Sequence, residues 1–147
     1  METLVRGGKV EDVDKLIAFL NEARVGTEGV ESGIEYFLIM EDKDGNIKAT
    51  LGIEPLGSYG LLRSLVMTSV LKEQDILVMF EQILRLARER QLTTLYLATN
   101  KSKSLDFFQV IGFEKEETEE LPKELMHSKH VQYILSVDNS VFMRLNL

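Results

Sequence analysis

The chain has 147 residues, of which 44% are hydrophobic and 28% charged, which is typical of one soluble globular domain, 1–147. Its formal net charge of −7 disfavours nucleic acid and anionic membranes as partners, and the lack of cysteine excludes disulfides, zinc–thiolate sites and a thiol nucleophile. No signal-peptide h-region is present, nor any run of about 18 apolar residues. We therefore expect a cytoplasmic protein.

The first half of the chain predicts one helix between short strands. The expected elements are, in order, a strand at 4–6, a helix at 10–23, and strands at 36–40, 47–56 and 61–67. The helix has apolar residues at helical spacing, with Glu11 and Asp12 in its first turn. Three glycines at 24–33 predict a loop, and Asp44-Gly45 is typical of a hairpin turn.

The second half begins with the strongest helical pattern of the chain, at 75–90, where six apolar residues form one stripe. The expected elements after it are a strand at 93–98, a helix at 102–111, and strands at 113–115, 132–137 and 141–145. The strand at 93–98 is expected parallel to the one at 61–67, because a helix connects them. This order predicts an α/β (α+β) fold with a mixed, mostly antiparallel sheet of six or seven strands between helices.

Three phrases of the sequence carry a resemblance to a known family. The first is "LLRSLVMTSVLKEQDILVMFEQILRLARERQLTTLYLAT", the second is "SLDFFQVIGF", and the third runs from "LPKELMHSK" to "SVDNSVFMRLNL". Together with the order of elements, they resemble the GNAT N-acetyltransferase superfamily. "GIEPLGSYGLLRSLV" resembles the branch of N-acetylglutamate synthase and the arsenic-resistance N-acetyltransferases.

The resemblance implies that acetyl-CoA is the co-substrate, that the central strands splay apart, and that no metal takes part. It also implies a homodimer, because C-terminal strands of this fold often pair between chains. The cofactor-binding positions that it implies are Leu65, Val66, Met67, Lys72, Glu73, Gln74, Asp75, Ile76, Leu77, Asn100, Ser104 and Phe108. Phe108 takes the place of a tyrosine that often protonates the leaving thiolate, and it has no hydroxyl.

The family's phosphate-binding loop, Arg/Gln-x-x-Gly-x-Gly/Ala, falls on residues 72–77. Lys72 keeps the positive charge of the first position, whereas Asp75 and Leu77 replace the two glycines. Glycine permits close approach of the backbone to a phosphate, and a carboxylate opposes it. Two interpretations stay open: a weakened acetyl-CoA site, or a helix whose N-terminus is occupied internally by Glu73 and Asp75.

Two charged side chains are candidates for the chemistry that the resemblance implies. Glu54, at the end of a predicted strand, is the candidate general base, and the alternative is a solvated glutamate. Arg63, on the predicted central strand, is the candidate ligand for an acceptor carboxylate, and the alternative is pairing with a surface acid. Regular alternation predicts that Ser64 lies on the face opposite to Arg63.

Two hypotheses about function follow. The first is an N-acetyltransferase that acts on a small, amino-acid-like amine. The second is a GNAT-fold binding or interaction module that no longer binds acetyl-CoA. His127 and His130 are interpreted as solvent-facing, since no third metal ligand lies near them in the sequence.

Overall fold

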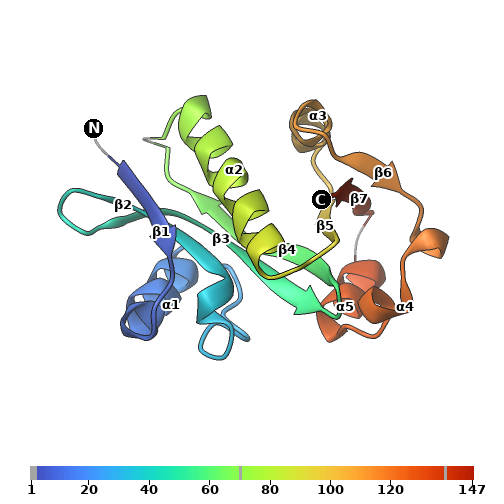
Figure 1. Ribbon diagram of the computed structural model, residues 1–147, viewed down its shortest axis with the longest axis horizontal. Coiled ribbons are helices and arrows are strands. Elements are labelled where there is room, and N and C mark those ends of the chain that lie inside the picture. The colour runs from blue at the N-terminus through green and yellow to red at the C-terminus, as the bar shows by residue number, and fades with distance from the viewer. Residues whose placement is uncertain (1–2, 70, 138) are drawn as a thin grey trace. The chain divides into compact units, whose positions relative to one another are not determined.

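The computed structural model describes residues 3–69, 71–137 and 139–147 (Figure 1). Its seven strands are β1 (Thr3–Gly7), β2 (Phe37–Asp42), β3 (Ile47–Leu56), β4 (Tyr59–Met67), β5 (Thr94–Thr99), β6 (Glu114–Glu116) and β7 (Val141–Asn146). They form one sheet in the order β1-β2-β3-β4-β5-β7-β6. Strands β4 and β5 pair in parallel, and the pairs β1–β2, β2–β3, β5–β7 and β6–β7 are antiparallel. The predicted mixed sheet is confirmed.

The α-helices are α1 (Val13–Glu22), α2 (Glu73–Glu89), α3 (Ser102–Val110), α4 (Lys123–Met126) and α5 (Lys129–Val137). Short 3₁₀ helices are η1 (Val10–Asp12), η2 (Ile34–Tyr36) and η3 (Thr118–Glu120). Among the helices of the described residues, none combines the length and the apolar composition that crossing a membrane requires.

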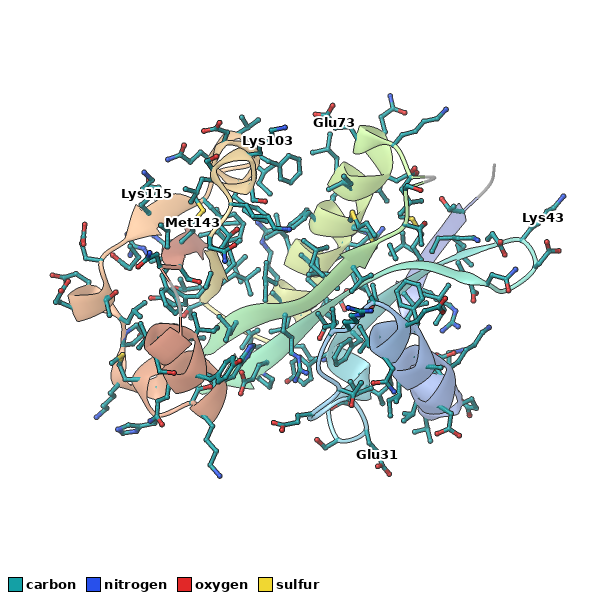
Figure 2. All side chains as sticks on the ribbon, turned by 180° about the vertical axis from the view of Figure 1, so that it is seen from behind. Glu31, Lys43, Glu73, Lys103, Lys115 and Met143 are labelled. Carbon is teal, nitrogen blue, oxygen red and sulfur yellow. The ribbon has the colours of Figure 1, made fainter. Side chains whose placement is uncertain are left out.

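The chain forms two compact units. The first contains the residues up to Glu54 together with Arg63–Leu86, and the second contains Pro55–Leu62 together with Ala87–Leu147. In the first unit, α1 and α2 cover opposite faces of the strands (Figures 1 and 2). A buried cluster joins α1, the loop after it and β2, and its members are Leu16, Leu20, Val30, Ile34 and Phe37.

The core of the second unit lies under α4 and α5. Its buried members are Leu61, Tyr96, Leu121, Leu125, Val131 and Phe142. Strand β7 pairs with β5 on one side and with β6 on the other, so both of its edges have partners within this chain. The homodimer implied by the resemblance stays a prediction.

The strand predicted at 132–137 is wrong, because this segment belongs to α5. Val131, Ile134 and Leu135 recur at helical spacing, and all three belong to the core of the second unit or pack against it. The helix also has an N-terminal cap, since the N–H of Val131 donates to Ser128 Oγ at 3.3 Å. Burial of one helical face therefore outweighed the β-propensity of the run "QYILSV".

An ion-pair network fixes the start of α1 against the edge of the sheet. The Nη1 and Nη2 atoms of Arg6 donate to the two carboxylate oxygens of Asp12 at 2.7 and 2.8 Å. The Nε of Arg6 donates to Glu41 at 2.9 Å, and the N–H of Lys9 donates to Asp12 at 2.8 Å. The hydrogen bonds from Arg6 lower the pKa of the buried Asp12 to about 2.

We predict that Asp12→Asn lowers the free energy of unfolding at pH 7 by about 2 kcal/mol, the value of the pKa depression. The folded-state pKa of Asp12 is below its unfolded value, so its stabilisation is complete above about pH 4 and is lost as the pH falls through 2. Urea unfolding should therefore show a difference between wild type and variant that shrinks toward pH 2. Asp14→Asn, at an exposed position of α1, is the control, and an equal effect there would contradict this account.

Candidate functional site

Arg63 lies at the centre of a charged arrangement in the first unit. Its Nε donates to Ser64 Oγ at 3.1 Å, and its Cζ lies 5.6 Å from the centroid of the Phe37 ring. Partial burial lowers the pKa of Arg63, and the negative charges of Glu54 and Glu28 oppose this shift. The guanidinium is therefore a positioned, partly desolvated cation with two carboxylates in its field.

The support for Arg63 comes from a close contact between β2 and β3. Gly52 is paired with Phe37, and a Cβ atom built on Gly52 would lie 2.6 to 2.9 Å from three atoms of the ring. The ring thus takes the space above Gly52 on this face of the sheet. Glu54 lies two residues further along β3, and alternation places it on the same face as Gly52. The structure therefore brings Glu54 and Arg63 to one face.

Ser64 interrupts the alternation of β4, and the prediction that it lies opposite to Arg63 is wrong. Its φ angle is 57°, in the left-handed region, and its hydroxyl accepts the bond from Arg63. Val66 packs against the buried cluster that contains Phe37, and the guanidinium of Arg63 lies over the Phe37 ring. Residues three apart share a face of a strand only when an extra residue lies between them. Ser64 is therefore an irregular, left-handed residue within β4.

The N-terminal end of α2 is closed by one of its own carboxylates. Asp75 Oδ2 accepts the N–H of Lys72 at 2.9 Å, and Lys72 O accepts the N–H of Asp75, also at 2.9 Å. Glu73 is exposed, and its side chain points away from the helix end (Figure 2). Leu77 is also exposed. Of the two acidic residues considered at this end, Asp75 forms the internal bond.

The remaining predicted cofactor positions belong to both units. Leu65, Val66 and Met67 end β4, and Gln74 and Ile76 lie in the first turn of α2, all in the first unit.

In the second unit, exposed Asn100 follows β5, and half-buried Ser104 lies on α3. Phe108 is buried, and its ring meets the ring of Phe113 edge-on at 5.9 Å. This ring therefore serves the core of the second unit.

Sequence reasoning missed three features around Arg63. The first is the contact between Gly52 and the Phe37 ring. A glycine inside a predicted strand indicates close approach of another group, so the signal for this contact was present at Gly52. The loop at 24–33 was predicted without a role. In the structure a Cβ atom on Gly29, whose φ angle is 77°, would lie 3.1 Å from Arg63 Nη1. No local signal marks Ser64 as left-handed.

The described residues contain no group of three or more His, Cys, Asp and Glu side chains that could hold a metal ion.

Comparison with known proteins gives one relative in sequence and several in structure. No model of a known protein family matches the chain. The chain is 37% identical over 141 residues to the uncharacterized protein YwlB of Bacillus subtilis strain 168, and the match covers 95% of each chain.

The structural relatives include an acetyltransferase of the GNAT family. Rv2747 of Mycobacterium tuberculosis, in complex with CoA, has a TM-score of 0.75 at 18% identity over 98% of this chain and 99% of its own. A GNAT-family acetyltransferase of Staphylococcus aureus Mu50 has a TM-score of 0.75 at 20% identity, with 99% of each chain covered. N-acetylglutamate synthase of Neisseria gonorrhoeae, complexed with coenzyme A and N-acetyl-glutamate, has a TM-score of 0.76 at 20% identity. The match covers 100% of this chain but 35% of the synthase. The fold predicted from the resemblance is confirmed.

We predict that Ser64→Val is less stable than Ser64→Gly by about 2 kcal/mol, because a β-branched residue disfavours a left-handed backbone that glycine adopts freely. Both variants remove the hydroxyl, so the loss of its hydrogen bond with Arg63 does not enter their difference. Urea unfolding of the two proteins measures it. The same pair of substitutions at exposed Lys115 of β6 is the control, where valine should be the more stable residue. Equal stabilities at position 64 would contradict the left-handed conformation of this residue.

Proposed function

Because the chain belongs to the family of YwlB and has the fold of the GNAT acetyltransferases, we propose that it is an acetyl-CoA-dependent N-acetyltransferase. Its acceptor is a small amine that also carries a carboxylate. One observation carries this proposal: Arg63, which contacts Phe37 and Ser64, lies on the same face of the sheet as Glu54. A cation and a carboxylate on one face suit an acceptor that has a negative and a positive end.

In this proposal Arg63 binds the carboxylate of the acceptor. Its Nε is already engaged by Ser64, so the side chain is oriented before the acceptor arrives. Stacking on Phe37 restricts the guanidinium further, which reduces the entropy lost on binding. A lysine at this position would keep the charge but not the planar fork that matches a carboxylate.

Glu54 is the proposed general base, which removes a proton from the acceptor ammonium so that the nitrogen has a free electron pair. Acetyl-CoA supplies the acetyl thioester, and the transfer replaces its C–S bond by a C–N bond and releases the CoA thiol. The carbonyl of the acetyl group is a target for backbone N–H groups at the end of β4, around Leu65–Met67, as the resemblance implies.

Two features of the N-terminal end of α2 favour binding of the CoA diphosphate, and one disfavours it. Lys72 supplies a positive charge, and the helix dipole favours an anion there. Asp75 places a negative charge at the same end and accepts the N–H of Lys72. This bond favours the second candidate function, a GNAT-fold module that binds a partner or ligand other than acetyl-CoA. For the N–H of Lys72 to bind a phosphate oxygen, Asp75 must release this amide.

We expect isothermal titration calorimetry to detect binding of acetyl-CoA, and CoA release to follow when an acceptor amino acid is added. Glu54→Gln should lower kcat at least about 100-fold while acetyl-CoA still binds, because it removes the base but not the cofactor site. Glu22→Gln, at an exposed position at the end of α1, is the control. If acetyl-CoA does not bind up to millimolar concentration, the enzyme proposal fails and the binding module is favoured.

The double variant Asp75→Gly, Leu77→Gly should bind acetyl-CoA more tightly than wild type. Two unit charges about 4 Å apart repel by roughly 4 kcal/mol at an effective dielectric of 20, so the gain has an upper bound of about three decades. Asp75→Asn alone tests the charge.

Calorimetry measures the affinities of these variants. Glu81→Gln removes the same charge elsewhere on α2 and should leave the affinity unchanged. Unchanged affinity in the double variant would mean that these two side chains do not block the site.

A further inference from the structure

The surroundings of Arg63 contain more negative than positive charge. The loop between α1 and η2 passes directly against the guanidinium, since a Cβ atom on Gly29 would lie 3.1 Å from Arg63 Nη1. Glu28 precedes this glycine in the loop and is exposed. Glu54 lies on β3, and the charges of both carboxylates act on the guanidinium. One cation is thus in the field of two anions from separate elements of the first unit.

This imbalance has a consequence for the charge of the acceptor. In the proposed function, the acceptor carboxylate pairs with Arg63, and the reacting ammonium lies toward Glu54. Glu28, in the loop between α1 and η2, is then the second carboxylate. An acceptor with a single ammonium has no further cation to pair with Glu28. A second positive group on the acceptor would balance it, whereas a second carboxylate would meet repulsion.

The position of Glu28 distinguishes it from the other acids of the loop. Glu31 belongs to the same loop, but its side chain points away from the protein (Figure 2). The carboxylates whose charges raise the pKa of Arg63 are Glu54 and Glu28. The left-handed backbone of Gly29, which brings the loop close to Arg63, fixes the path of the chain immediately after Glu28.

We propose that Glu28 determines acceptor specificity and that the acceptor is a basic amino acid, with one carboxylate and a second cationic group besides the reacting amine. This inference rests on the proposed function and specifies the substrate class of the same site. Arg63 selects the carboxylate, Glu54 serves the reacting amine, and Glu28 selects the second cation. An acidic amino acid is disfavoured because its extra carboxylate is repelled by the charge of Glu28.

The test uses the full chain with acetyl-CoA and follows CoA release with L-lysine, L-arginine, L-glutamine and L-glutamate. The expected kcat/KM is about tenfold higher for the two basic amino acids than for L-glutamine, and lowest for L-glutamate. In Glu28→Gln the ratio of kcat/KM for L-lysine to that for L-glutamine should fall about tenfold, mainly through KM. Glu28→Lys should shift the preference toward L-glutamate. Glu31→Gln, the matched control from the same loop, should keep the wild-type ratio.

Two results would overturn the inference while leaving the proposed function intact. One is acetyl transfer with equal kcat/KM for basic, neutral and acidic acceptors. The other is a Glu28→Gln variant whose ratio equals that of Glu31→Gln.

If no acceptor is acetylated, the proposed function fails, and calorimetry of the amino acids alone decides the charge preference. Tighter binding of L-lysine than of L-glutamate, lost in Glu28→Gln, would support the role of Glu28. Equal binding, or no binding of either, would overturn it.

Discussion

The left-handed backbone of Ser64 is the constraint on which the arrangement around Arg63 depends. It costs on the order of 1 kcal/mol, because a side chain disfavours this conformation. In return, one strand places Arg63 and Val66 on the same face, where a regular strand would separate them. Val66 thereby joins the core under α1, and Arg63 receives both a hydrogen bond and an aromatic ring. The strain in the backbone, the packing of Val66 and the placement of Arg63 thus all depend on Ser64.

The end of α2 shows a different balance between stability and binding. The exchange of hydrogen bonds between Lys72 and Asp75 satisfies the N–H groups of these two residues at the helix terminus without any ligand. A diphosphate that binds the N–H of Lys72 must therefore replace Asp75 as its partner. Any affinity that this helix end has for an anion is reduced by the free energy of that exchange.

Much of the fold was predictable because its signals are local. The hairpin at Asp44-Gly45, the apolar stripe of α2 and the parallel pairing of β4 with β5 all follow from short patterns. The helix at Lys129–Val137 was not, since its residues suit a strand by propensity and a helix by spacing. Only the core that it covers decides between the two.

The candidate site was less predictable than the fold, because its parts lie far apart in the sequence. Glu54 and Arg63 were candidates by residue type and by resemblance. Their common support, the Phe37 ring above Gly52, requires the register of β2 and β3. The contribution of Gly29 requires the path of a loop that has no periodic pattern.

Phe37 belongs at once to the buried cluster under α1 and to the support of Arg63. Gly52 has no side chain at the position that this ring fills, so any side chain at position 52 would displace the ring. During divergence of the family, the recognition surface and the core are therefore not independent. A lineage that altered the preference of this site by moving Arg63 would have to repack the interior in the same steps, whereas replacement of the exposed Glu28 does not touch the buried cluster. New preferences should thus arise in the loop first.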